Sequence, residues 1–382
     1  MIMDEKLFKK LDRREFREIA EINKAFHIDF YHLPLGLDIP FIQSVQAMLT
    51  QGPCLKKKTV LFVNDSQFKY HEKHILLFLN RKFKHCDCYN IANPNFSLKT
   101  SLKNVRYLTE SIPDKFYDRV IVYRGLEFLL QNINKIKTDK FYVLLTNIDV
   151  VYIHKNQDTL DILKKLKNKI VYFNLFKNTL DYISPSASQI QFQDAINWPP
   201  NLDIFYHVPK KFVFDYLVMG GVSRDYRFLY NNRRLFKGKK VIITHCDANK
   251  YRRDQNERSY DMKYLGLLNK NKEFICLKRI HESLYCRLLL FSRITICMFR
   301  KKVGTDSTCI SDAIWYGKPV LTTKTMATDH LKNHAFFIHN TKDMKTILHK
   351  LKDRSFYENM TKKITKYARK ENNIFNLLKL IK

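Results

Sequence analysis

Residues 304–320 read Gly-Thr-Asp-Ser-Thr-Cys-Ile-Ser-Asp-Ala-Ile-Trp-Tyr-Gly-Lys-Pro-Val, and this segment is the most informative part of the chain. Its pattern predicts a loop, a short helix and then a buried strand, because apolar side chains recur at helical spacing between the two glycines. Gly317 can adopt the left-handed conformation that ends a helix, and Pro319 prevents the helix from continuing.

The start of this helix is a candidate phosphate site. A helix that follows a glycine-bearing loop presents backbone N–H groups without partners in the helix, and such groups suit a phosphate. Serine and threonine in the loop can also cap the helix. The residues of this candidate site are Gly304, Thr305, Asp306, Ser307 and Thr308.

A second glycine unit lies earlier, within residues 214–229. An apolar strand runs into Gly220 and Gly221, and a Ser-Arg-Asp sequence then opens a helix. The glycines let a ligand approach the backbone closely, Arg224 offers a fixed cationic fork, and Ser223 can cap the helix.

Together the two units resemble the donor-binding half of GT-B glycosyltransferases, especially the family-four-like group. Those enzymes carry a Gly-Gly-x-x-Arg-Asp-Tyr-like element and, further on, an acid-Ala-x-x-x-Gly-Lys-Pro-Val element. The resemblance covers roughly residues 214–370. It implies two doubly wound, Rossmann-like domains facing a cleft. It also implies a nucleoside-diphosphate sugar as donor, no cofactor, and a hexosyl transfer that needs no metal.

The sequence departs from the family at one acidic position. Many members have two glutamates, the second directly before the alanine of the helix. Here Asp312 takes the second place and Gly304 the first. Asp312 lies off the predicted buried face of the helix, so the resemblance implies that it contacts the ribose hydroxyls of the donor. The contacts of the missing acid are either left without a replacement or are made by Asp306.

Two series of apolar runs, separated mostly by helical stretches, predict an α/β protein with two parallel sheets. The first series is 59–63, 88–92, 119–123, 141–145, 169–175 and 202–208, and the second is 214–219, 240–244, 273–277, 293–299, 319–323 and 335–339. The predicted parts are a helical extension (1–56), an acceptor domain (57–210), a donor domain (211–352) and C-terminal helices (353–382). The resemblance implies that the last helices cross back to the first domain.

The acceptor hydroxyl needs a general base, which the resemblance places in the first domain. Asp65 directly follows a predicted strand, and Asp149 is the second candidate. A carboxylate there could accept the proton as the new bond forms. Both residues also fit the alternative role of a turn cap.

The chain has 68 Lys and Arg against 37 Asp and Glu, a net charge of +31. This excess favours an anionic partner: a membrane surface, a glycan acceptor or DNA. The alternative is a compositional bias, because Lys, Asn, Ile and Phe are all abundant, as AT-rich coding DNA produces.

The eight cysteines lie mostly in apolar segments, which favours buried thiols in a reducing compartment. Their spacing does not fit a zinc site, so we expect no metal. The charged amino terminus and the absence of a long apolar stretch predict a cytoplasmic protein. It would lie peripherally on the inner face of the membrane if the basic surface meets lipid, or in the host cytoplasm if the source is viral.

Three functions stay open. The first is a glycosyltransferase acting on a surface polysaccharide, a lipid-linked glycan or a protein. The second is a viral-type glycosyltransferase that modifies hydroxylated bases in DNA, for which the positive charge would serve phosphate contacts. The third is a GT-B-like module that binds nucleotides without catalysis, since Gly304 replaces an acid.

Overall fold

The structure is a computed structural model of the 382-residue chain. It describes residues 13–30, 33–37, 43, 55–65, 75–76, 79–80, 82–92, 102–145, 152–153, 156, 158–166, 169–174, 192–193, 207–220, 224–245, 255–278, 280, 282–300, 308–325, 328, 331 and 333–368. The chain forms two compact units. We call residues 43–200 with 371–382 the N-terminal unit, and residues 1–42 with 201–370 the C-terminal unit.

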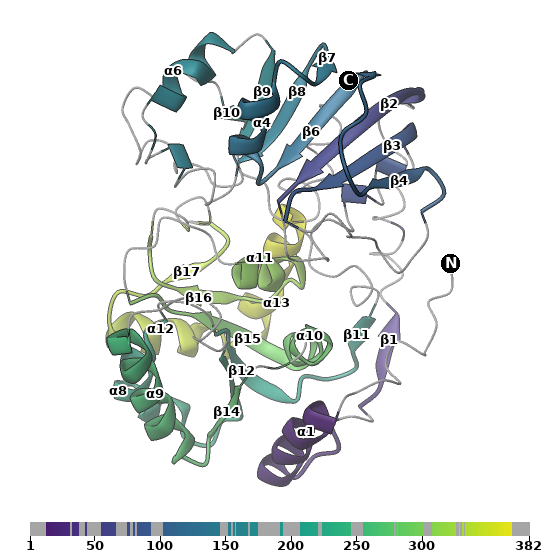
Figure 1. Ribbon diagram of the computed structural model, residues 1–382. Coiled ribbons are helices and arrows are strands. Elements are labelled where there is room, and N and C mark those ends of the chain that lie inside the picture. The colour runs from purple at the N-terminus through teal and green to yellow at the C-terminus, as the bar shows by residue number, and fades with distance from the viewer. Residues whose placement is uncertain are drawn as a thin grey trace. The chain divides into compact units, whose positions relative to one another are not determined.

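The described part of the N-terminal unit contains a seven-stranded sheet whose paired strands are all parallel. Its strands in spatial order are β10 (Phe192–Gln193), β9 (Ile170–Asn174), β8 (Phe141–Leu145), β6 (Arg119–Tyr123), β2 (Leu55–Asn64), β3 (Phe83–Asn90) and β4 (Val105–Leu108) (Figure 1). Its helices include α4 (Leu126–Asn132) and α6 (Asp158–Lys165), and β5 (Phe116–Tyr117) pairs with β7 (Lys137–Thr138). The first strand of the sheet, β2, lies beside β6, so the direction of strand addition reverses between them.

The described part of the C-terminal unit contains a six-stranded parallel sheet. Its order is β14 (Phe274–Lys278), β13 (Val241–His245), β12 (Phe214–Val218), β15 (Ser292–Cys297), β16 (Val320–Thr322) and β17 (Phe336–Phe337). Its helices include α1 (Arg13–Phe26), α8 (Tyr226–Asn231), η3 (Arg233–Phe236), α9 (Gln255–Asn269), α10 (Glu282–Phe291), α11 (Thr308–Trp315), α12 (Thr341–Lys350) and α13 (Arg354–Lys366). Here the reversal falls between β12 and β15.

The predicted fold class is confirmed, since both units have parallel, doubly wound sheets. The apolar runs correspond to strands, with one change. The run 202–208 was predicted to end the first sheet, but β11 (His207–Pro209) pairs antiparallel with β1 (Leu35–Leu37) in the C-terminal unit. Strand β4 was missed because Val105–Leu108 is an edge strand with little buried apolar surface.

The unit bounds differ from the predicted domain bounds at both ends of the chain. The predicted extension 1–56 is not separate, because the Phe30 ring lies 5.2 Å from the Phe214 ring and 5.6 Å from the Phe291 ring. Arg287 also donates to the Phe30 carbonyl at 3.2 Å. Helix α13, predicted to follow the donor domain, packs on α11 within it. Residues 369–382 lie outside the described residues.

Helix α11 ends as the sequence predicts. Gly317 has a φ of +65°, and its N–H donates to Ile314 at 2.9 Å while the Lys318 N–H donates to Ala313 at 2.9 Å. This is the Schellman pattern of helix termination. A side chain at Gly317 would also come within 2.5 Å of Thr365 Oγ1 on α13, so the glycine serves both the turn and the packing.

Lys318 has a structural role. Its buried Nζ donates to the carbonyls of Leu290 at 2.8 Å and Ser292 at 2.7 Å, where α10 ends and β15 begins. It also lies 4.4 Å from the centre of the Phe212 ring. Burial lowers the pKa of Lys318 to about 7. The Gly-Lys-Pro-Val element therefore fixes α11 to α10 and β15.

Gly220 is required by the approach of two backbones. A Cβ placed there would lie 1.7 Å from the Thr244 carbonyl oxygen and 2.8 Å from the Cα of His245. The Gly220 N–H donates to Thr244 Oγ1 at 3.1 Å, which ties the carboxyl ends of β12 and β13 together. Any side chain would push these strand ends apart.

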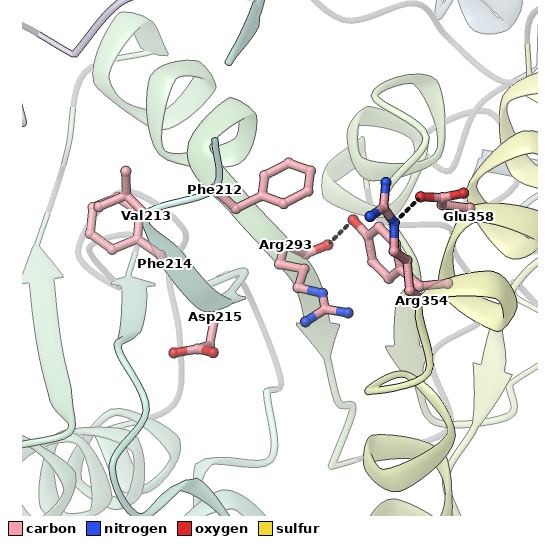
Figure 2. A pocket seen from close by; sticks show the side chains of 8 residues that line it. Phe212, Val213, Phe214, Asp215, Arg293, Arg354 and Glu358 are labelled. Atoms are coloured by element: carbon pink, nitrogen blue, oxygen red, sulfur yellow. Dashed lines mark hydrogen bonds and ion pairs between the residues drawn. The ribbon is translucent and has the colours of Figure 1, made fainter. Parts of the chain in front are cut away.

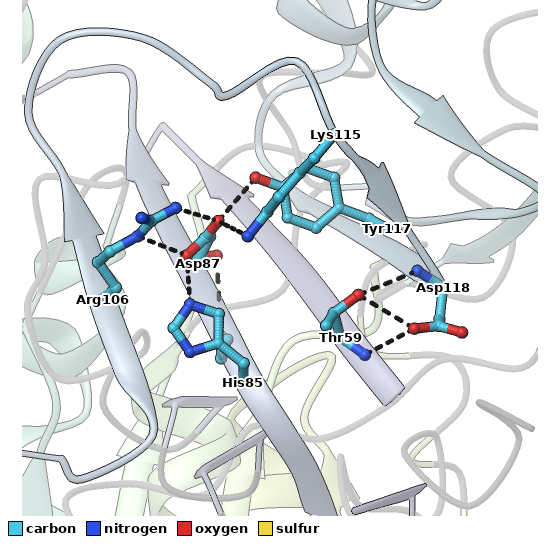
Figure 3. Close-up of polar contacts among 8 residues, drawn as sticks. Thr59, His85, Asp87, Arg106, Lys115, Tyr117 and Asp118 are labelled. Atoms are coloured by element: carbon cyan, nitrogen blue, oxygen red, sulfur yellow. Dashed lines mark hydrogen bonds and ion pairs between the residues drawn. The ribbon is translucent and has the colours of Figure 1, made fainter. Parts of the chain in front are cut away.

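In the N-terminal unit, β3 carries a buried carboxylate, Asp87 (Figure 3). Arg106 donates to both of its oxygens at 2.9 Å, Lys115 lies at 2.8 Å and the Tyr117 hydroxyl at 2.7 Å. His85 Nε2 lies 2.9 Å away. Burial alone would raise the pKa of Asp87, but the hydrogen bonds from Arg106, Lys115 and Tyr117 lower it to about 2.

We predict that Asp87→Asn lowers the free energy of unfolding at pH 7 by about 2 kcal/mol or more, because the cations lose their counter-ion. The pKa of Asp87 is lowered in the folded state, so its contribution is complete above pH ~4 and is lost as the pH falls towards 2. The gap between wild type and variant should therefore close over that range in urea titrations. Asp114→Asn is the control: this carboxylate is 78% exposed in its pair with Lys137, and we expect a change under about 0.5 kcal/mol. Equal losses in both variants would contradict the assignment.

A second prediction compares two glycines of the C-terminal unit. Gly220→Ala should destabilise the protein by about 2 kcal/mol or more, since backbone atoms must move. Gly266→Ala is the matched control, because a Cβ added there would have no atom within 4 Å and the residue sits inside α9. There alanine should be neutral or stabilise by up to about 1 kcal/mol. Thermal and urea unfolding measure both changes, and a Gly220→Ala variant as stable as wild type would refute the packing argument.

Candidate functional site

Gly220 follows β12 at the carboxyl edge of the C-terminal sheet, where strand addition reverses between β12 and β15. Ligands of doubly wound sheets bind in the crevice beside such a point. The Met219 N–H donates to the Ile296 carbonyl at 2.9 Å, and the Asp225 N–H donates to Met298 at 3.0 Å. The loop after β12 is thus hydrogen-bonded to the end of β15.

Helix α11 starts beside the same loop. Thr308 is its first residue, and the Cys309 thiol in its first turn donates to the Gly220 carbonyl at 3.6 Å. This contact brings the two sequence units together. Gly304, Thr305, Asp306 and Ser307 lie outside the described residues, as do Gly221 and Ser223.

Arg224 lies in the β12 loop, with 5% of its surface exposed. Its Nε donates to the Met219 carbonyl at 3.0 Å, and its Nη2 lies 3.5 Å from the Gly220 carbonyl. The guanidinium stacks 4.6 Å from the centre of the Phe299 ring. Arg224 therefore fixes the backbone of the loop and places a positive charge at this edge of the sheet.

The cap of helix α8 differs from the prediction. The sequence indicated Ser223, but Asp225 directly precedes the helix and accepts from the Phe228 N–H at 2.9 Å. Asp225 is the residue that precedes the first helical position, so its carboxylate reaches the unpaired N–H groups of the first turn.

Asp312 lies on the half-buried side of α11, while Ile310, Ala313 and Ile314 are buried, as the helical spacing predicts. Burial raises the pKa of Tyr285 on α10, and the negative charge of Asp312 adds to the rise. Asp312 thus lies near α10, close enough for its charge to act on Tyr285.

Sequence reasoning missed three polar residues at this edge. Tyr285 donates to Met219 Sδ at 3.6 Å, and His245 Nδ1 lies 3.2 Å from the Tyr226 hydroxyl. Thr323 Oγ1 accepts from the Phe299 N–H at 3.0 Å. His245 is the last residue of β13 and Thr323 follows β16, so their places at strand ends were the signal that could have found these two residues.

The N-terminal unit has its own candidate at the point where strand addition reverses. Asp65 directly follows β2, and its N–H donates to the Tyr123 carbonyl of β6 at 3.1 Å. Burial raises the pKa of Asp65, Arg124 opposes this, and Glu127 adds to the rise. Arg124 has a φ of +57°, which is uncommon for a residue other than glycine. Asp149, the second predicted base, lies outside the described residues.

The expectations on metals, thiols and membranes can be compared with the described residues. Within them, no group of three or more His, Cys, Asp or Glu is placed to hold a metal. Cys86, Cys88, Cys286 and Cys297 are buried and do not form disulfide bonds. No helix in the described ranges is long and apolar enough to cross a membrane.

Comparison with known proteins supports the fold, but it does not show a family or an activity. No protein-family model matches the chain, and no curated protein sequence matches it. Among solved structures, the chain is similar to a sucrose-phosphate synthase from Thermosynechococcus elongatus, with a TM-score of 0.59. The match covers 85% of this chain and 96% of that chain at 10% identity. At this identity the likeness shows the fold alone. The chain has the GT-B type of fold, with two Rossmann-like domains, and the narrower resemblance to the family-four-like group stays a prediction.

Proposed function

We propose that this protein is a glycosyltransferase that moves a sugar from a nucleoside-diphosphate sugar to an acceptor hydroxyl. The observation that carries the proposal is the contact between the first turn of α11 and the loop after β12, through Cys309 and Gly220, where strand addition reverses. Both segments carry the motifs of the GT-B resemblance, and this edge is where doubly wound sheets bind nucleotides. The GT-B type of fold supports the same reaction class.

The proposed donor contacts follow from the chemistry of this edge. The diphosphate would accept from N–H groups at the start of α11, in the loop 304–308, whose dipole favours negative charge. Arg224 would add a fixed positive charge as the leaving group becomes more negative. Asp312 would accept hydrogen bonds from the ribose. We propose that the transfer needs no metal and no cofactor.

Asp65 is the proposed general base of the N-terminal unit. Its burial favours the neutral acid, so its pKa is raised from the ordinary range towards working pH. A base with a pKa nearer to working pH takes up the acceptor proton more effectively. Glu127 and Arg124 adjust this pKa in opposite directions.

The proposed acceptors are a surface polysaccharide, a lipid-linked glycan or a protein, with an anionic membrane or glycan beside the basic surface. The charge of +31 also favours the second candidate, a viral-type enzyme that modifies DNA bases. Duplex binding that weakens steeply with salt, together with sugar transfer to hydroxylated bases, would support that candidate. Nucleotide binding without any turnover would instead support a non-catalytic module.

We predict that Asp312→Asn raises the donor KM roughly tenfold, which corresponds to about 1.4 kcal/mol, because the amide accepts fewer hydrogen bonds from ribose. Asp312→Glu should keep much of the affinity, since it restores the acid of the family. Glu358→Gln, which alters an exposed pair on α13, is the control and should leave KM unchanged. Steady-state kinetics with a folded Asp312→Asn variant decides the assignment, and an unchanged KM would remove Asp312 from the donor site.

For Asp65, we predict that Asp65→Asn lowers kcat by about 10²- to 10⁴-fold while nucleotide affinity stays constant. In the wild type, activity should fall at acid pH with a pKa above the ordinary range of an aspartate, and the variant should lose that limb. Asp114→Asn in the same unit controls for the loss of one carboxylate. A fully active Asp65→Asn variant would show that the base lies elsewhere.

A further inference from the structure

We propose that the C-terminal unit carries a second anion site, which binds a ligand with two or more phosphate groups. The site is a pocket of about 640 Å³ between the loop that precedes β13 and helix α12. We call it the lysine pocket. It is lined by Tyr216, Leu235, Lys237, Lys239, Lys342, Lys345, Thr346, Leu348, His349, Lys350 and Lys352.

The charge of this pocket is one-sided, because lysines and a histidine line it and no carboxylate does. Two carboxylates reach the loop from outside: Asp215 pairs with Lys239 at 3.2 Å, and Glu273 accepts from the Gly238 N–H at 3.4 Å. Among the described residues, no carboxylate lies within ion-pair distance of the other five lysines. Their mutual repulsion costs stability, and a polyanion would relieve that cost.

Interaction with the dipole of helix α12 explains only some of the positive charges that line the pocket. His349 and Lys350 lie in the last turn of α12, where positive charge offsets the helix dipole. Lys342 lies in the first turn of the helix, where a cation is unfavourable, and Lys237 belongs to another segment. What these residues have in common is that they line the same pocket.

The shape of the pocket favours a discrete ligand. Tyr216 and Leu348 are buried at its floor, and the volume falls within the range of small-molecule sites. Lysine ammonium groups are compact charges on flexible stems, which can follow several phosphates. A flat membrane or a long duplex would contact the rim and leave the concave floor unused.

A second pocket of the same unit, of about 540 Å³, differs from the lysine pocket in the charges that line it (Figure 2). Its arginines already have partners: Arg354 pairs with Glu358 at 2.8 Å, and Arg293 donates to the Leu351 carbonyl at 2.8 Å. Asp215 adds a second carboxylate to its lining. That pocket has balanced charge and gives no reason to expect an anion.

The lysine pocket is separate from the proposed donor site. Lys237 and Lys239 precede β13, so the pocket lies towards the amino ends of the strands, whereas Gly220 and the start of α11 lie at the carboxyl edge. The proposal therefore does not rest on glycosyl transfer. Two sources share the required chemistry: a free polyphosphate or nucleotide, and the phosphorylated headgroup of a lipid.

The test uses the full chain and sodium tripolyphosphate, with binding measured by calorimetry at low and moderate salt. The pocket variant Lys342→Gln/Lys345→Gln/Lys350→Gln changes exposed side chains. The control Lys263→Gln/Lys362→Gln/Lys363→Gln removes the same charge from exposed positions outside the pocket. We expect the pocket variant to raise the Kd at least tenfold, or to lose one class of sites, and the control to change it less than twofold.

A second assay, with vesicles of phosphatidylcholine and a phosphoinositide, distinguishes a lipid headgroup from a free phosphate ligand. Cosedimentation that only the pocket variant loses assigns the site to a lipid headgroup, while tripolyphosphate binding without vesicle binding assigns it to a free ligand. Equal weakening in both variants would overturn the proposal, because overall charge would then explain the binding. Absence of binding to both probes would overturn it too. So would duplex DNA binding that depends on the pocket lysines without tripolyphosphate binding.

Discussion

The candidate site depends on one short segment, Met219-Gly220, at the end of β12. The backbone of β13 approaches so closely that Gly220 has no room for a side chain. The two carbonyls of the segment accept from Arg224 and Cys309, and Met219 Sδ accepts from Tyr285. Two strands and the helices α10 and α11 are therefore held around one dipeptide. Close backbone packing at Gly220 therefore helps to position Arg224, Cys309 and Tyr285 at this edge.

Local chemistry explains what the sequence could predict. The end of α11 was predictable because Gly317 and Pro319 impose it within a few residues. The buried strands were predictable because each apolar run must be covered on both faces of a parallel sheet. The packing of Phe30 on Phe214 and Phe291 was not predictable, since these residues are distant in sequence and no local pattern links them.

The site was predicted only in part, because contacts that depend on the path of a loop are not set by the local sequence. Arg224 was identified as a cation near a ligand, but its contacts to Met219 and Gly220 depend on the path of the loop. Asp225 rather than Ser223 caps α8, because the helix begins later than the sequence suggested. Lys318 is a further example. It belongs to the Gly-Lys-Pro-Val element, but its side chain is buried and donates to two backbone carbonyls. The carboxylates that we propose for the site are Asp312, which would bind the ribose, and Asp65, which would act as the general base.

The proposed function requires that the carboxyl edge of the C-terminal sheet binds a nucleoside diphosphate. A crystal structure of the protein with UDP or GDP would show this edge occupied or empty. We expect the diphosphate beside Gly220 and the start of α11, with the ribose within hydrogen-bond distance of Asp312. A nucleotide bound only at the amino ends of the strands, or an empty carboxyl edge at millimolar nucleotide, would show that the donor site is elsewhere.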